Sequence, residues 1–265
     1  MSPAYEHILV DRLDAVGRIT FNRPELLNAL APQTLDEIQR ALAGFEADAA
    51  VRAILFIGKG ASFSSGGDLA LLERLASATP AEIKDTVYRF FAGGVKAVKL
   101  CPKPTVAAVR GHAVTAACEL ALACDFRIAS ETAMFSESWV KLGLTAPLGG
   151  LVMLPRIVGM TRATEMLMTG RRVPAAEAER IGLVNRVVPD AKLEEEALTL
   201  ARELAEGPPR ALAAIKEGLR RGLDGRLTEE MDFALLSQAM LISAPDYKEG
   251  LAAVKERRKP RFSGR

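Results

Sequence analysis

The first 130 residues alternate between strand and helix patterns, and this alternation constrains the fold more than any other feature. Short apolar runs typical of strands occupy residues 18–22, 53–58, 105–109 and 126–129. Apolar residues at helical spacing lie between them, over 34–47, over 80–99 and from about residue 116. Strands that alternate with helices form parallel, right-handed βαβ units. The sequence therefore predicts an α/β fold.

The strand patterns end near residue 190. The rest of the chain has helical spacing over residues 193–205, 209–220, 227–239 and 245–256. We therefore expect a core over residues 1–190, which would hold the functional site, and a helical C-terminal region over residues 191–265.

Composition excludes several classes of protein. The 265 residues are 49% hydrophobic and carry a net charge of only +2, which argues against disorder and against a broad nucleic-acid-binding face. No signal peptide is visible, and the best apolar run, residues 113–123, is too short to cross a membrane. The three cysteines form no CxxC pair, so neither a disulfide framework nor a zinc site is expected. We expect a cytoplasmic protein with no metal and no nucleic-acid or membrane partner.

Two junctions between a strand and a helix contain residues suited to chemistry. The first, residues 60–69, contains Gly66 and Gly67, which lack a Cβ and let a ligand approach the backbone closely. Backbone N–H groups at the start of the following helix have no partner inside it and can donate to an anion. The alternative is a plain surface turn in which Asp68 caps the helix.

The second junction, residues 110–120, places small residues at the start of a helix and Glu119 in its first turn. Apolar neighbours would raise the pKa of this carboxyl group toward the range of a general base. The alternative is a glutamate that only supports the helix terminus through the helix dipole.

From about residue 19 to residue 258 the chain resembles the crotonase (enoyl-CoA hydratase/isomerase) superfamily. Several motifs in a fixed order carry this resemblance. They are residues 22–30 (NRPELLNAL), 61–69 (ASFSSGGDL), 103–113 (KPTVAAVRGHA) and 117–126 (ACELALACDF), followed by shorter matches at 135–137, 141–144, 154–159 and 182–188.

The resemblance implies a spiral of ββα units with a helical C-terminal trimerisation region, assembled as a homotrimer or as a hexamer made of two trimers. It also implies an acyl-CoA substrate and no separate cofactor, since coenzyme A is part of the substrate. The amides of Gly67 and Ala116 would hold the thioester oxygen while it gains enolate charge, with Glu119 as the acid/base. Ser65 and Gly66 would lie beside the bound coenzyme A.

The chain departs from the family pattern in ways that bear on the reaction. Alanine stands at positions 116 and 117, where the family usually has glycine, and Leu26 stands where it often has a lysine that contacts phosphate. Hydratases of the family use a second glutamate, and Trp139 occupies that position here. The aspartate that some isomerases use is also missing from residues 146–150.

A single carboxylate suits a proton transfer from one carbon to another, so we expect isomerase-type chemistry in which Trp139 forms an apolar wall that excludes water. Glu137 is expected to be a solvated side chain. The alternatives are an enoyl-CoA hydratase and a homologue that binds a coenzyme A thioester without catalysis.

Two other classes of protein fit the sequence less well than the crotonase superfamily. A serine hydrolase needs a Ser–His pair, and the chain has only His7 and His112. A dinucleotide-binding protein would need a GxGxxG motif, which residues 58–60 do not complete.

The last eleven residues carry a net charge of +5. This tail is either solvated or places Lys259 or Arg258 against a phosphate of coenzyme A, in the same subunit or a neighbouring one.

Overall fold

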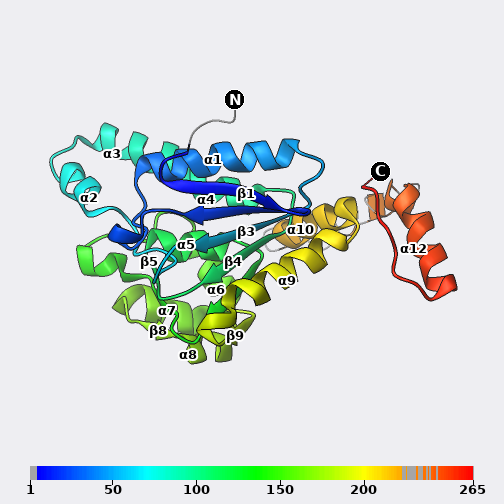
Figure 1. Cartoon of the computed structure of the whole chain (residues 1–265). Coiled ribbons are helices and arrows are strands. Elements are labelled where there is room, and N and C mark those ends of the chain that lie inside the picture. Colours follow the sequence, from blue (N-terminus) through cyan, green and yellow to red (C-terminus); the bar gives the residue numbers. More distant parts are fainter. Residues whose placement is uncertain are drawn as a thin grey trace.

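The computed structural model describes residues 5–222, 225, 231, 235, 236, 238, 240–242 and 244–264 (Figure 1). Within them the chain is a mixed α/β protein, as the alternation of strand and helix patterns predicts. The helix predicted over residues 227–239 lies mostly outside the described residues.

The larger sheet has six strands in the order β1-β2-β3-β4-β6-β9. These strands are β1 (Ile8–Leu13), β2 (Val16–Phe21), β3 (Ala53–Gly58), β4 (Thr105–Val109), β6 (Phe126–Ser130) and β9 (Arg186–Val188). All neighbouring pairs are parallel except β1 with β2. The predicted parallel βαβ arrangement is therefore confirmed, with one antiparallel strand added at the edge.

A smaller sheet extends the structure beside the first. It has the order β5-β7-β8, with β5 (His112–Val114) parallel to β7 (Met134–Ser136) and β7 antiparallel to β8 (Val173–Pro174). The sequence analysis did not identify these strands because each has only two or three residues.

Helices connect and cover the strands. They are α1 (Pro32–Ala47), α2 (Leu69–Leu75), α3 (Pro80–Thr86), α4 (Gly93–Leu100), α5 (Ala116–Ala123), α6 (Gly150–Val158), α7 (Met160–Thr169), α8 (Ala175–Arg180), α9 (Leu193–Glu206), α10 (Pro209–Gly222) and α12 (Pro245–Glu256). The single helix predicted over residues 80–99 is divided into α3 and α4 by a π-helical segment, Val87–Ala92. Two glycines, Gly93 and Gly94, follow this segment, and glycine weakens a regular helix.

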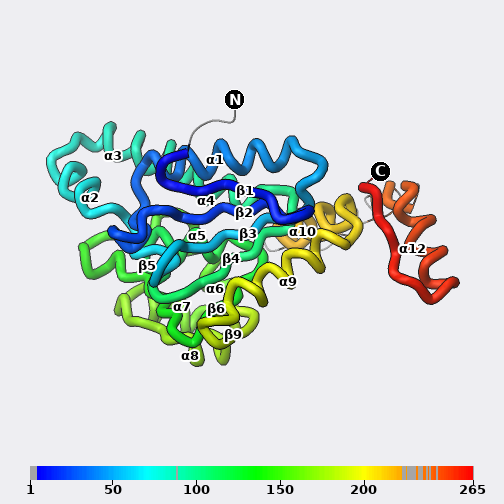
Figure 2. Tube along the Cα trace, viewed as in Figure 1, coloured from blue at the N-terminus to red at the C-terminus, as the bar shows by residue number. Residues whose placement is uncertain are grey.

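The larger sheet is buried on both faces. In β3, Ile54 and Phe56 pack into the main core with α1, α4 and α5, whereas Ala53, Leu55 and Ile57 point to the opposite face. Helix α9 runs along the sheet (Figure 2) and covers that second face. It does so with a stripe of apolar residues spaced four apart, namely Leu193, Ala197, Ala201 and Ala205. Because α9 packs directly on the sheet, it contributes to the core, and the division of the chain at residue 190 stays a prediction.

Helices α10 and α12 lead away from the sheets. Helix α12 and the C-terminal end lie on the opposite side of the molecule from α2 and β5 (Figure 1). Within the described residues, no helix has both the length and the apolar character that crossing a membrane requires.

Arg127 joins the end of α5 to the loop before β9. Its buried guanidinium donates to the carbonyl oxygens of Leu183 (2.8 Å), Ala121 (3.3 Å) and Cys124 (2.6 Å). Three backbone acceptors in the core therefore depend on one side chain, which fixes the far end of the helix that carries Glu119.

Replacing Arg127 with methionine should lower the free energy of unfolding by about 3 kcal/mol, because buried carbonyl groups lose their donor. Urea unfolding of both proteins measures this difference. Arg202→Met is the matched control, since Arg202 forms an ion pair with Asp14 at 3.0 Å in which both side chains are largely exposed. That control should change stability by less than about 1 kcal/mol. Equal effects of the two substitutions would contradict this account of Arg127.

Candidate active site

The two junctions singled out in the sequence lie against each other. The amide of Ser64 donates to the carbonyl of His112 at 2.8 Å, and the amide of Val114 donates to the carbonyl of Ser64 at 3.3 Å. Gly66, with a φ of +96°, comes so close that a Cβ there would lie 2.1 Å from Thr115 Oγ1 and 2.5 Å from the Val114 oxygen. Only glycine allows this approach, so Gly66 brings the first loop onto the start of α5.

The amides of Gly67 and Ala116 are available to a ligand. Gly67 precedes Asp68, the residue that caps α2, and Ala116 is the first residue of α5. Among the residues that the structure describes, neither amide donates to an acceptor in the protein. The structure therefore offers two free N–H donors on neighbouring segments.

Thr115 fixes the direction of the Ala116 amide through an unusual backbone conformation. Its φ of 49° and ψ of −118° are unfavourable for a β-branched residue. A hydrogen bond from its amide to the carbonyl of Ser136 at 2.8 Å holds it in place. Strain of this kind at a non-glycine residue is found mainly at functional sites.

Asp68 caps α2, as the alternative interpretation of the first loop proposed. Its carboxylate accepts hydrogen bonds from the amides of Ala70 (3.0 Å) and Leu71 (3.4 Å), and it forms an ion pair with Arg23 at 2.9 Å. The cap does not involve Gly67, so capping and ligand binding are compatible in this loop.

Glu119 is completely buried, and three N–H donors hold its carboxylate. Oε1 accepts from the amides of Leu148 (2.8 Å) and Gly150 (2.7 Å), whereas Oε2 accepts from Trp139 Nε1 (3.0 Å). Gly150 begins α6, and a Cβ at this position would lie 2.9 Å from Oε1. The close approach of Gly150 thus directs a helix N-terminus at the carboxylate.

Burial raises the pKa of Glu119 from 4.5 to about 7, against the opposing effect of the hydrogen bonds from Gly150, Leu148 and Trp139. The alternative of a glutamate that only supports its own helix does not explain this environment, because all three donors belong to residues outside α5. At neutral pH a carboxyl group with such a pKa is populated both as base and as acid.

Trp139 is more than the apolar wall that its position suggested. It lies in a short 3-10 helix, Ser138–Leu142, and is buried. Its indole nitrogen donates directly to Glu119, so Trp139 also stabilises the charged form of that carboxyl group.

The expectation for Glu137 was wrong. This residue is not solvated but has no exposed surface, and neither of its carboxyl oxygens has a hydrogen-bond partner. Burial and the nearby Glu119 raise the pKa of Glu137 well above its ordinary value. No local pattern predicts this burial, because Glu137 lies between two serines.

Of the other predicted site residues, Ser65 lies in the first loop, whereas Lys259 and Arg258 lie away from Glu119. Ser65 lies next to Gly66 in the first loop, where its amide donates to the carbonyl of Leu27 at 2.9 Å. Lys259 lies in the C-terminal tail with 91% of its side chain exposed, 3.7 Å from Glu206. The neighbouring Arg258 forms an ion pair with Glu249 at 2.6 Å. The tail of this chain therefore does not meet Glu119, and its predicted contact with a phosphate stays a prediction.

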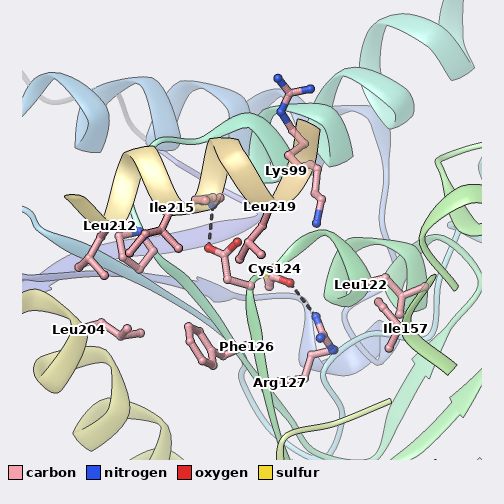
Figure 3. A pocket seen from close by; sticks show the side chains of 14 residues that line it. Lys99, Leu122, Cys124, Phe126, Arg127, Ile157, Leu204, Leu212, Ile215 and Leu219 are labelled. Atoms are coloured by element: carbon pink, nitrogen blue, oxygen red, sulfur yellow. Dashed lines mark hydrogen bonds and ion pairs between the residues drawn. The ribbon is translucent and has the colours of Figure 1, made fainter. Parts of the chain in front are cut away.

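A separate hollow of about 420 Å³ lies at the other end of α5 (Figure 3). Mainly apolar side chains line it, among them Leu122, Phe126, Ile157, Leu204, Ile215 and Leu219. The ion pair between Lys216 and Asp125, at 2.7 Å, joins α10 to the core there. Its lining does not include Glu119, so this hollow is distinct from the candidate active site.

In the described part of the chain, no group of three or more His, Cys, Asp or Glu residues could hold a metal ion.

Comparisons with known proteins identify the family of the chain and its fold. The family described as enoyl-CoA hydratase/isomerase matches residues 11–265. A protein of Rhizobium meliloti (strain 1021) named "Probable enoyl-CoA hydratase" is 40% identical over 99% of this chain and 100% of its own length. The "Crotonyl-CoA hydratase" of Syntrophomonas wolfei is 36% identical over 98% of each chain.

A solved structure from Geobacillus kaustophilus HTA426, described as "Enoyl-CoA Hydrates Subunit I Other Form", superposes with a TM-score of 0.91. It is 39% identical to this chain, and the match covers 98% of this chain and 99% of that one. The expected superfamily and its α/β fold are thereby confirmed.

Replacing Trp139 with phenylalanine should raise the pKa of Glu119 by about one unit, because the charged carboxylate loses one of its three donors. Carbon-13 NMR of the side-chain carboxyl groups, assigned with Glu119→Gln, measures this titration. Leu142→Ala, in the same short helix but with an exposed side chain, is the control and should leave the pKa near 7. An unchanged pKa in the phenylalanine variant would contradict the role of the indole.

Proposed function

Because the chain belongs to the enoyl-CoA hydratase/isomerase family, we propose that it adds water to the double bond of a 2-enoyl-CoA thioester. Relatives that match almost its whole length are named hydratases. These names favour hydration, the alternative of the sequence analysis, over the isomerase-type chemistry that we expected first. The observation that carries the proposal is a buried carboxyl group with a pKa of about 7, close in the fold to two free amides.

The amides of Gly67 and Ala116 would hold the thioester oxygen. When a nucleophile adds to the carbon β to the thioester, negative charge moves onto this oxygen as an enolate. Two N–H groups fixed in advance stabilise this charge, and loss of one such donor typically costs about 3–4 kcal/mol of transition-state stabilisation. The alanine at position 116 does not prevent this role, because alanine keeps its amide hydrogen.

Glu119 would be the acid/base, and Oε2 is its reactive oxygen. Oε1 already accepts two backbone hydrogen bonds, whereas Oε2 accepts only the one from Trp139. A carboxylate oxygen can accept more than one hydrogen bond, so Oε2 can also receive a proton from water.

The proton that Glu119 takes can complete the reaction. As an O–H bond of water breaks, its proton moves to Oε2 and the hydroxyl group bonds to the β carbon. The electron pair of the double bond moves into the enolate, whose charge lies on the oxygen held by the two amides. The enolate then takes the proton from Oε2 at its α carbon, which restores the thioester carbonyl and the carboxylate.

Exposed apolar residues next to the backbone donors of Glu119 support an apolar acyl chain as ligand. Leu144, Leu151 and Val152 are each about half exposed. They lie beside Leu148 and Gly150, which hold the carboxylate. An apolar chain would cover them without requiring further polar partners.

Isomerisation is the second candidate, and Trp139 is the observation that favours it. The tryptophan occupies the position at which hydratases of the family have their second glutamate. A single base that takes a proton from the γ carbon and returns it to the α carbon would move the double bond without using water. The same two amides would then hold a dienolate.

We retain the homotrimer or hexamer as a proposal about assembly. Ile215 and Leu219 on α10, and Leu251 and Val254 on α12, expose large apolar side chains. Such surfaces are usually covered by another chain. In that arrangement Lys259 would be free to contact coenzyme A bound to a neighbouring subunit.

The test is to give the purified protein a 2-enoyl-CoA and, separately, a 3-enoyl-CoA, and to separate the products. We expect 3-hydroxyacyl-CoA from the 2-enoyl substrate. Glu119→Gln should lower the rate at least about a hundredfold while coenzyme A binding is retained. The control is Glu131→Gln, which should keep the wild-type rate because Glu131 is an exposed glutamate directly after β6.

Three results would change the proposal. A 2-enoyl product from the 3-enoyl substrate, without hydration, would select the isomerase. Binding of coenzyme A without turnover of either substrate would select the non-catalytic homologue. A near-wild-type rate in Glu119→Gln would show that Glu119 is not the acid/base of the reaction.

A further inference from the structure

The site contains a second buried carboxyl group that the proposed reaction does not use. Glu137 directly follows β7 and lies two residues before Trp139, which donates to Glu119. Glu137 has no exposed surface, and both of its oxygens lack a hydrogen-bond partner. A polar group this deeply buried without partners is costly, so its presence calls for a physical explanation.

The two carboxyl groups have opposite environments. Glu119 accepts hydrogen bonds from three N–H groups, one of them at the N-terminus of α6. Glu137 accepts none of comparable geometry. A buried carboxylate is tolerated where donors replace its lost hydration, and a neutral carboxylic acid needs far less compensation. If the pair carries one negative charge, this charge therefore belongs on Glu119.

The neighbours of Glu137 strengthen this assignment. Its titratable neighbours among the described residues are Glu119 and Cys118. The carboxylate of Glu119 repels a second negative charge. Burial raises the pKa of the Cys118 thiol well above its ordinary value, so the thiol stays neutral. It can give Glu137 only a weak S–H hydrogen bond and brings no positive charge. No Lys, Arg or His side chain forms an ion pair with Glu137 in the described residues.

We propose that Glu137 is held as a neutral carboxylic acid beside Glu119 and, as a positioning residue, keeps the working site at a single negative charge on Glu119. This inference rests on the proposed function only for its link to the reaction. If Glu137 were ionised, its charge would hold a proton on Glu119 and so remove the base at neutral pH. A second charge would also oppose the enolate that forms during the reaction.

Infrared difference spectroscopy tests the protonation of Glu137 directly and without substrate. At pH 8 the wild-type protein should show the C=O band of an un-ionised carboxylic acid. Glu137→Gln should abolish this band, and the control Glu131→Gln should keep it. Absence of the band from the wild-type protein, or its persistence in Glu137→Gln, would overturn the proposal.

A second variant covers the case in which Glu137→Gln fails to fold. Glu119→Gln keeps Glu137 in place, so the band of the un-ionised acid should persist in that protein at pH 8. Its loss there together with its presence in the wild-type protein would assign the proton to Glu119 instead, and would overturn the proposal. Because these readings need no turnover, they stand even if hydration of enoyl-CoA is not observed.

The pH profile links the proton to the reaction. Glutamine is neutral, as Glu137 is proposed to be, so the acid limb of the rate profile near pH 7 should shift by less than about 0.3 units in Glu137→Gln. If Glu137 is charged in the wild-type protein, its removal would lower the pKa of Glu119. A shift of the acid limb by one unit or more toward lower pH would then contradict the proposal.

Discussion

The rest of the site depends on the hydrogen bonds that three N–H groups donate to the carboxylate of Glu119. Burial alone would make this carboxyl group a weak acid that stays neutral at physiological pH. The amides of Leu148 and Gly150 and the indole of Trp139 oppose burial and leave its pKa at about 7. The balance of these two effects gives one group that can both take and return a proton.

The fold explains how distant segments meet at this carboxylate. The loops that follow the parallel strands of the larger sheet all begin at the same edge of that sheet. The smaller sheet connects to these loops through short pairings, such as that of Ala113 with Ser64. Gly66 then lets one loop lie directly on Thr115 at the start of α5. Arg127 fixes the other end of α5. The helix is thus constrained at both ends, which fixes the position of Glu119 relative to the free amides.

Much of this could be predicted where the physical cause is local in the sequence. The buried strands around Ile54 and Val106, the cap at Asp68 and the apolar setting of Glu119 all follow from neighbouring residues. The donors to Glu119 could not be predicted in the same way, because Leu148 and Gly150 are about thirty residues away along the chain. Glu137 was misjudged for a similar reason: its neighbours in sequence are polar, whereas in the fold it is buried beside Cys118 and Glu119 of α5. The helix predicted at residues 80–99 was drawn too long because its apolar spacing continues past Gly93 and Gly94, whereas the structure divides it just before them.

In the proposed reaction the amides of Gly67 and Ala116 converge on the carbonyl oxygen of a bound thioester beside the charged Glu119. Isotope-edited Raman spectroscopy of a 2-enoyl-CoA labelled with carbon-13 at the thioester carbonyl tests it most directly, using Glu119→Gln to prevent turnover. Binding should lower the carbonyl stretching frequency below its value in water, because two fixed donors polarise the bond. A frequency equal to that of the free thioester in water would contradict it.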